Sequence, residues 1–107
     1  MALTFNEFQA KSLARSARYF GMAVDSWTET DWACAAAGEL GEACNLIKKL
    51  RRGEDVPAIE IAKELADAIT YIDLLMYRLG FATGDIVAMK FNEVNARVSC
   101  PLMLSND

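Results

Sequence analysis

Four acidic residues stand in two pairs whose spacing could bring their carboxylates together. Glu39 and Glu42 are three residues apart, and the same interval separates Glu64 from Asp67. In an α-helix, residues three apart project about 60° from each other, so both members of a pair share one side of the helix. Two such helices packed in opposite directions could gather all four carboxylates into one cluster.

Packed carboxylates repel one another, so such a cluster needs compensation. At an effective dielectric constant of about 20 and a separation of about 4 Å, each like-charge contact costs on the order of 4 kcal/mol before screening. The chain has no histidine, which removes imidazole as a metal ligand and as a catalytic base. Carboxylate oxygens alone favour Mg²⁺, with Mn²⁺ as a possible substitute, and Mg²⁺ commonly takes phosphate oxygens from its substrate. We therefore expect a magnesium site that receives a nucleotide polyphosphate.

A second interpretation of the acids is open at this point. Acids on a helix often belong to a solvated face that pairs with basic side chains, here Lys48, Lys49, Lys63 or Arg78. Against this, Glu64 and Asp67 lie on a helix that is otherwise apolar over most of its circumference. Such a helix should be largely buried, so its acids should face something specific.

Capping and stop signals divide the chain into four helices and predict an all-α fold. Thr4 with Glu7 resembles a capping box that opens a first helix, which runs to about residue 19. Thr28 or Thr30 can cap a second helix that runs to about residue 51, before Gly53. A third helix is expected from 55–57 to 79 and a fourth, capped by Thr83, from 84 to 97. We expect one domain over residues 1–98 and an irregular tail over 99–107.

The apolar third helix also predicts self-association. Three other short helices in a chain of 107 residues can hardly cover a helix that is apolar on nearly every side, and the remainder would form a large exposed patch. We expect a homodimer or homotetramer, in which a partner could complete the site.

Composition excludes several classes of function. Eleven Lys and Arg against 15 Asp and Glu give a net charge of −4, which argues against a nucleic-acid partner. No apolar run reaches the roughly 18 residues of a spanning helix, and the N-terminus lacks the apolar block of a signal peptide, so we expect no membrane association and a cytoplasmic location. Cys34, Cys44 and Cys100 form no C-x-x-C pair, which favours reduced core cysteines.

The two acidic motifs together resemble a known family. Gly38-Glu39-Leu40-Gly41-Glu42, 21 intervening residues and then Glu64-Leu65-Ala66-Asp67 are similar to the E-x-x-E…E-x-x-D signature of MazG-like all-α nucleoside triphosphate pyrophosphohydrolases. The similarity extends over roughly residues 30 to 97. The resemblance implies an antiparallel four-helix bundle that binds Mg²⁺ and hydrolyses a nucleotide between its α and β phosphates, for (d)NTP giving (d)NMP and pyrophosphate.

Residue roles follow from this resemblance. It implies that the metal ligands are Glu39, Glu42, Glu64 and Asp67, and that Lys90 and Asn95 contact phosphate, with Arg97 a weaker candidate. One carboxylate would orient or deprotonate the attacking water, and Glu39 and Glu42 are the candidates. The aromatic rings nearby could stack on a base or simply pack in the core: Tyr71, Trp27 and Trp32.

The predicted function is nucleotide-pool housekeeping by a Mg²⁺-dependent nucleoside triphosphate pyrophosphohydrolase. One alternative is a non-enzymatic helical module, an adaptor or antitoxin-like regulator, whose acidic stripe contacts a basic partner. The other is a hydrolase with the same metal chemistry that acts on nucleoside diphosphates or another pyrophosphate-linked metabolite.

Overall fold

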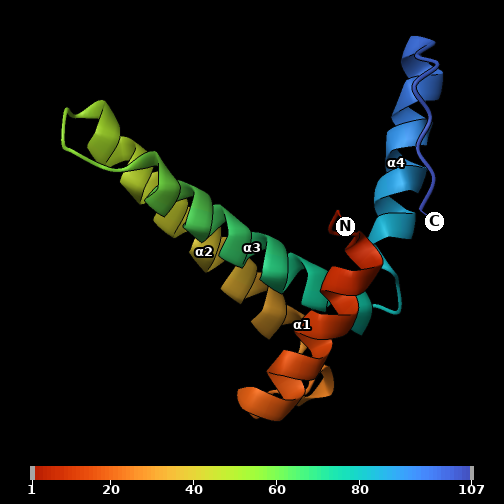
Figure 1. The fold of residues 1–107 in the computed structure, drawn as a ribbon, viewed down its shortest axis with the longest axis horizontal. Helices are drawn as coiled ribbons and strands as arrows, with labels where there is room; N and C mark the ends of the chain where they lie inside the picture. The colour runs from red at the N-terminus through yellow and green to blue at the C-terminus, as the bar shows by residue number, and fades with distance from the viewer. Residues whose placement is uncertain (1, 107) are drawn as a thin grey trace.

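Two long antiparallel helices form the main body of the protein. The structure is a computed structural model that describes residues 2–106. Helix α2 spans Glu29–Arg51 and helix α3 spans Ala58–Arg78, and the two lie side by side along their length (Figure 1). Gly53 adopts a φ of 90° in the turn between them, a conformation that side chains with a Cβ atom rarely tolerate.

The other elements gather at the opposite end of this pair. Helix α1 spans Phe5–Tyr19 and is followed by a short 3₁₀ helix, η1, at Val24–Ser26. Helix α4 spans Thr83–Val98. Figure 1 shows α1 crossing the end of the α2–α3 pair, while α4 points away from it. The part of the chain that the structure describes contains no strand, which confirms the all-α prediction, and none of its helices is long and apolar enough to cross a membrane.

The N-cap threonines of the first two helices are confirmed, but the capping box expected of Thr4 and Glu7 is only half formed, because the Glu7 carboxylate pairs with Lys11 instead. Thr4 caps α1 by accepting a hydrogen bond from the backbone N–H of Glu7, 3.1 Å away. Thr28, rather than Thr30, caps α2 in a reciprocal capping box with Asp31. The backbone and hydroxyl hydrogen bonds from Thr28 lower the pKa of the Asp31 carboxyl.

Thr83 does not cap the fourth helix as expected. Ala82 occupies the N-cap position without a side-chain hydrogen bond, and Thr83 is the first helical residue. Its hydroxyl donates instead to Asp73 Oδ1 on α3 and accepts from Gln9 Nε2 on α1 at 3.2 Å. The side chain therefore joins helices rather than completing one.

A buried polar cluster fixes the junction of α1, α3 and α4. Gln9, Asp73 and Thr83 are all buried. Besides Thr83, Gln9 Nε2 contacts Asp73 Oδ1 at 3.4 Å and donates to the carbonyl of Phe81 at 3.3 Å. Asp73 Oδ2 has no hydrogen-bond partner among the described residues. Burial raises the pKa of Asp73, and the hydrogen bonds from Thr83 and Gln9 oppose that rise.

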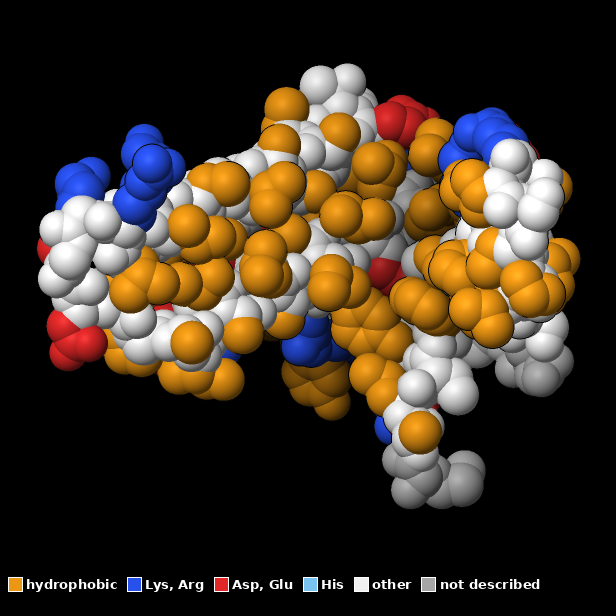
Figure 2. All heavy atoms as spheres, turned by 90° about the horizontal axis from the view of Figure 1, so that it is seen from above, with side chains coloured by type: hydrophobic (Ala, Val, Ile, Leu, Met, Phe, Trp, Pro, Cys, Tyr) orange, Lys and Arg blue, Asp and Glu red, His pale blue; other side chains and the backbone are white. Residues whose placement is uncertain are grey.

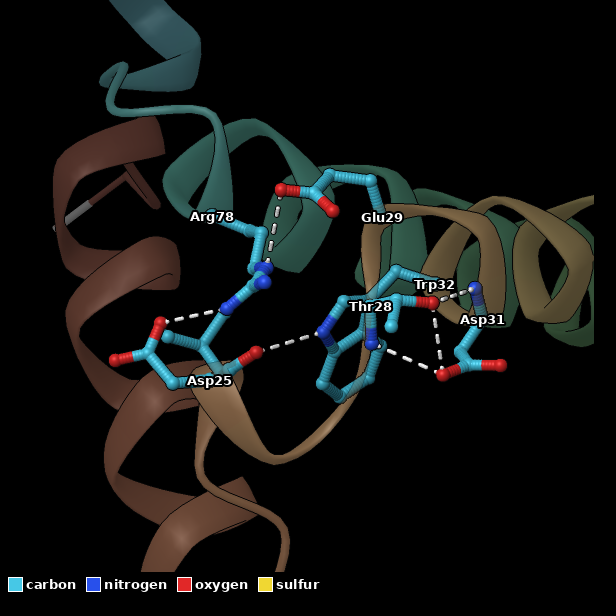
Figure 3. A network of polar contacts seen from close by, with 7 residues as sticks. Asp25, Thr28, Glu29, Asp31, Trp32 and Arg78 are labelled. Carbon is cyan, nitrogen blue, oxygen red and sulfur yellow. Dashed lines mark hydrogen bonds and ion pairs between the residues drawn. The ribbon is translucent and has the colours of Figure 1, made fainter.

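A second polar network ties the connector before α2 to the end of α3 (Figure 3). Arg78 Nη1 donates to Asp25 Oδ1 at 2.9 Å, and its Nε lies 3.4 Å from Glu29 Oε1. The Trp32 ring is fully buried, and its Nε1 donates to the carbonyl of Val24 at 2.9 Å. These contacts hold η1 against the α2–α3 pair, so the connector forms one wall of the region described below.

The segment after α4 runs back along that helix (Figure 1). Ser99 ends α4 in the left-handed conformation, with a φ of 56°. Asn92 then pairs twice with Leu104, donating to its carbonyl at 2.8 Å and accepting from its N–H at 2.9 Å. Asn95 donates to the carbonyl of Leu102 at 2.6 Å. Two asparagine side chains thus hold a segment that has no regular secondary structure.

One copy of the chain leaves much of its apolar surface uncovered. Its accessible surface is 7557 Å², whereas a compact monomer of 11.8 kDa exposes roughly 5,900 Å². The radius of gyration is 16.2 Å, against about 13 Å for a compact domain of this length. Figure 2 shows apolar side chains over much of the face that is seen from above. The single copy therefore does not show the closed antiparallel bundle that the sequence predicts.

Two burial predictions are wrong within one copy. Helix α3 was expected to be largely buried, yet its large side chains at Ile59, Leu65, Ile69 and Ile72 are all exposed. Cysteines were expected in the core, yet Cys34 and Cys44 are exposed and Cys100 is half-buried, although all three are free as predicted. In one copy, α4 points away from the α2–α3 pair and leaves its faces uncovered.

Candidate functional site

Three of the four predicted acids meet between α2 and α3. Glu39 comes from α2, and Glu64 and Asp67 come from successive turns of α3. One carboxylate oxygen from each lies within 4.8 Å of those of the other two. We call these three residues the carboxylate triad. Antiparallel packing of two helices with acids at i and i+3 brings them together, as the sequence predicts.

The triad has no basic partner among the described residues. Lys63 pairs with Glu60 at 3.7 Å, and Arg78 pairs with Asp25 and Glu29 instead. The pKa of Glu39 is raised, and the main cause is a hydrogen bond with the Glu64 carboxyl. Desolvation and the negative charges of the neighbouring acids, Asp67, Glu64 and Glu42, raise it further. None of the basic side chains named by the second interpretation pairs with the triad, although Asp67 itself is exposed. A hard divalent cation fits this donor set, because such ions prefer carboxylate oxygens.

Glu42 lies outside the triad. The residues that α2 buries are Trp32, Ala36 and Ala43. At 100° per residue, Glu39 is roughly 40° from the centre of that buried stripe and Glu42 roughly 100° from it. Glu42 is accordingly exposed, although its charge still contributes to the raised pKa of Glu39. Equal spacing in the sequence thus gives the two glutamates different positions.

A cleft of about 270 Å³ opens beside the triad. Glu39 and Asp67 form part of its lining, α1 and the connector supply the opposite side, and Tyr71 and Leu74 continue it along α3. Its volume is slightly below the roughly 300 Å³ at which small-molecule pockets usually begin. The full lining is Ser12, Arg15, Ser16, Phe20, Met22, Trp32, Glu39, Asp67, Thr70, Tyr71 and Leu74.

The three predicted aromatic residues lie in a row next to this cleft. The ring centroids of Trp27 and Trp32 are 4.7 Å apart, and those of Trp32 and Tyr71 are 6.1 Å apart. Trp32 and Tyr71 line the cleft, but the Trp32 ring is fully buried and packs as a core residue. Trp27 is half-buried and packs behind Trp32. Tyr71 is the one of the three best placed to contact a ligand.

The residues expected on phosphate lie elsewhere in the single copy. Lys90 is on α4, lines an apolar surface with Ile86 and Phe91, and pairs with Glu93 at 3.4 Å. Asn95 is buried and binds the C-terminal segment. Arg97 pairs with Glu93 at 2.8 Å. Within one chain, none of these three side chains lines the cleft beside the triad.

Helix α1 contributes cleft residues that sequence analysis did not identify. Ser12 and Arg15 face the cleft, and Ser16 donates to the carbonyl of Met22 at 2.5 Å. Their spacing of three and four residues is a helix-face pattern. Two small polar residues on the inward side of an amphipathic helix were the available signal, but nothing in the sequence showed that α1 crosses the acidic pair of helices.

The fold and the site define an all-α protein with a candidate carboxylate metal centre beside an aromatic cleft. Comparison of the chain with protein-family models, with curated proteins and with solved structures finds no match. The inference about function therefore depends on the site and on the two acidic motifs.

Proposed function

We propose that the protein is a Mg²⁺-dependent nucleoside triphosphate pyrophosphohydrolase, which converts a nucleoside triphosphate and water to the monophosphate and pyrophosphate. The observation that carries the proposal is the convergence of Glu39, Glu64 and Asp67 beside a cleft with aromatic walls. The carboxylates suit a hard cation, and the aromatic walls suit a nucleobase. The similarity of the two acidic motifs to those of MazG-like enzymes supports the same reaction, on ribo- or deoxyribonucleotides of the cellular pool.

The triad residues would hold the ion, and Glu42, three residues after Glu39 on α2, lies outside the triad. When bound, Mg²⁺ neutralises charge on phosphate oxygens and lowers the pKa of a coordinated water. Of the two candidate bases, Glu39 lies in the triad and lines the cleft, whereas Glu42 does neither, so Glu39 is the better placed.

The active molecule is proposed to be a homo-oligomer. The accessible surface of one copy exceeds that of a compact monomer of the same mass by roughly 1,600 Å². A standard protein interface buries only about 800 Å² per partner, so the excess is large enough for one. Each copy has apolar surfaces around Ile69 on α3 and Phe91 on α4. These surfaces could pack against those of a second copy. A neighbouring α4 would also be the element that brings Lys90 towards the triad.

Product analysis tests the proposed reaction. The protein is incubated with Mg²⁺ and a panel of ribo- and deoxyribonucleoside triphosphates, and pyrophosphate and orthophosphate are quantified separately. We expect pyrophosphate and the matching monophosphate. Release of orthophosphate, or activity on diphosphates with little on triphosphates, would replace the proposal with a different hydrolase. Absence of any turnover would favour the non-enzymatic module.

A matched pair of variants on α3 tests the site itself. Glu64→Gln removes a triad charge and should lower kcat/KM by roughly a hundredfold or more, because the ion loses a ligand. Glu60→Gln, one turn earlier, removes an exposed acid that pairs only with Lys63 and should change kcat/KM by less than about twofold. Circular dichroism checks that both variants fold. Equal activity of the two variants would remove Glu64 from the site.

Glu42→Gln then separates a three-acid site from a four-acid site. Since Glu42 lies outside the triad, we expect a loss about tenfold smaller than that of Glu64→Gln, in the range of groups that act around a metal rather than on it. A loss as large as that of Glu64→Gln would mean that the Glu42 carboxylate turns inward and binds the ion directly.

A further inference from the structure

A polyphosphate that approaches the triad brings negative charge to an acidic region, so a fixed cation is needed nearby. Among the residues that line the cleft, the only basic one is Arg15. The cations that the sequence favoured are on α4, where Lys90 and Arg97 both pair with Glu93. Within one chain, the basic side chain that shares the cleft with triad residues is therefore on α1.

Arg15 is free to take an anion. It forms no ion pair with any described residue, and its guanidinium lies over the Phe20 ring, 5.4 Å from the ring centroid. Stacking on an aromatic ring orients the planar guanidinium and leaves its N–H groups available. A guanidinium held in this way can form paired, charge-assisted hydrogen bonds to phosphate.

Ser12 supplies a second polar group to the same cleft. Its residue is only 5% exposed and lines the cleft. Its Oγ is not among the sealed, unpartnered side-chain atoms of the described residues, so the hydroxyl opens onto the cleft. By contrast, the neighbouring hydroxyls are already used: Ser16 donates to Met22 and Thr70 donates to Ala66.

We infer that Arg15 and Ser12 form a phosphate-binding wall on α1, which holds the polyphosphate of the substrate against the carboxylate triad from the opposite side of the cleft. The inference rests on the proposed function and assigns its phosphate subsite to this chain's own α1. Arg15 binds phosphate oxygens through its guanidinium, and the Ser12 hydroxyl donates to one of them. Neither residue takes part in bond cleavage, so both are positioning residues.

Calorimetric titration with inorganic tripolyphosphate and Mg²⁺ measures this wall without turnover. Arg15→Gln should raise the Kd about tenfold or more, as expected for loss of a hydrogen-bonded charge. Ser12→Ala should raise it severalfold, and Arg15→Lys should recover part of the loss. Arg18→Gln is the matched control, because Arg18 is an exposed arginine of the same helix outside the cleft. The difference between wild type and Arg15→Gln should shrink as salt is added.

The outcomes separate this inference from the proposed reaction. If Arg15→Gln, shown by circular dichroism to be folded, binds tripolyphosphate as tightly as wild type does, the inference is overturned even if pyrophosphate is released from a nucleotide. If tripolyphosphate binds through Arg15 but no triphosphate is hydrolysed, the wall stands and the proposed reaction fails. If the wild type does not bind tripolyphosphate at all, the wall is overturned.

Discussion

Asp73 is a buried carboxylate that has a full set of contacts on only one of its oxygens. Thr83 and Gln9 contact Oδ1, and Oδ2 is sealed without a partner among the described residues. Because burial raises its pKa above the ordinary value of 3.8, the folded state prefers the protonated form. The stability contributed by that proton is present at pH below the ordinary pKa and is lost as pH rises through the raised pKa.

The pH dependence of unfolding tests this residue. Asp73→Asn keeps an oxygen for Thr83 and Gln9 but carries no charge, so it should not lose stability as pH rises from below 4 to 7. Urea unfolding at several pH values gives the free energy of unfolding of each protein. The free energy of the variant, relative to that of wild type, should increase as pH rises. Thr83→Val removes a hydrogen-bond donor from the Asp73 carboxylate. This variant should therefore lose more stability than wild type as pH rises, by about 2 kcal/mol at neutral pH. Parallel pH profiles for all three proteins would contradict the assignment.

At the residue scale, helical periodicity explains both the success and the failure of the sequence analysis. The triad could be predicted, because i, i+3 acids on two antiparallel helices share a face. The exposure of Glu42 could be recovered only once the buried stripe of α2 was known. Arg15 and Ser12 could not be assigned, because their role depends on the angle at which α1 crosses the other helices.

At the element scale, the helix bounds followed from local chemistry. Thr4 and Thr28 cap as expected, and Gly53 and Gly80 adopt positive φ in turns after helices. The direction of α4 was not predictable, because it depends on the contacts of Gln9 with Asp73 and Thr83, which are 64 and 74 residues away in the sequence. Local sequence signals determine where a helix ends, but not the direction of the helix that follows.

The C-terminal segment offers a test at this scale. Asn92→Ala removes both hydrogen bonds to Leu104 and should release the segment from α4. Hydrogen exchange of the Leu104 amide, which donates to Asn92 Oδ1, should then speed up at least about tenfold, since the two lost hydrogen bonds are worth about 1 kcal/mol each. Arg97→Gln, an exposed change on the same helix, is the control. Unchanged protection of Leu104 would show that the segment is held by other contacts.

At the scale of the whole molecule, α3 and α4 leave apolar faces uncovered in one copy, and we expect these faces to govern assembly. A chain with this much exposed apolar surface should bury it against a second copy. Light scattering should therefore give a mass that is a multiple of 11.8 kDa. Because assembly stabilises the folded state by mass action, Tm should also rise with protein concentration.

Phe91→Glu tests which face is covered. Phe91 lies with Ile86 and Val94 on the apolar side of α4 and is 41% exposed in one copy. A buried charge at that point would be costly, so the variant should dissociate at concentrations where wild type remains assembled. Ala96→Glu, at an exposed position of the same helix outside that apolar surface, controls for charge alone. A monomeric wild type, or a Phe91→Glu oligomer as stable as wild type, would contradict the expected interface.

The aromatic row has a practical consequence. Both tryptophans of the chain, Trp27 and Trp32, lie in it, and Trp32 lines the cleft. The intrinsic tryptophan fluorescence of the protein thus originates next to the cleft where a nucleotide would bind. No tryptophan elsewhere in the chain adds a background signal. Quenching or a wavelength shift on titration would give occupancy directly, and replacing Tyr71 with phenylalanine would leave both emitters in place.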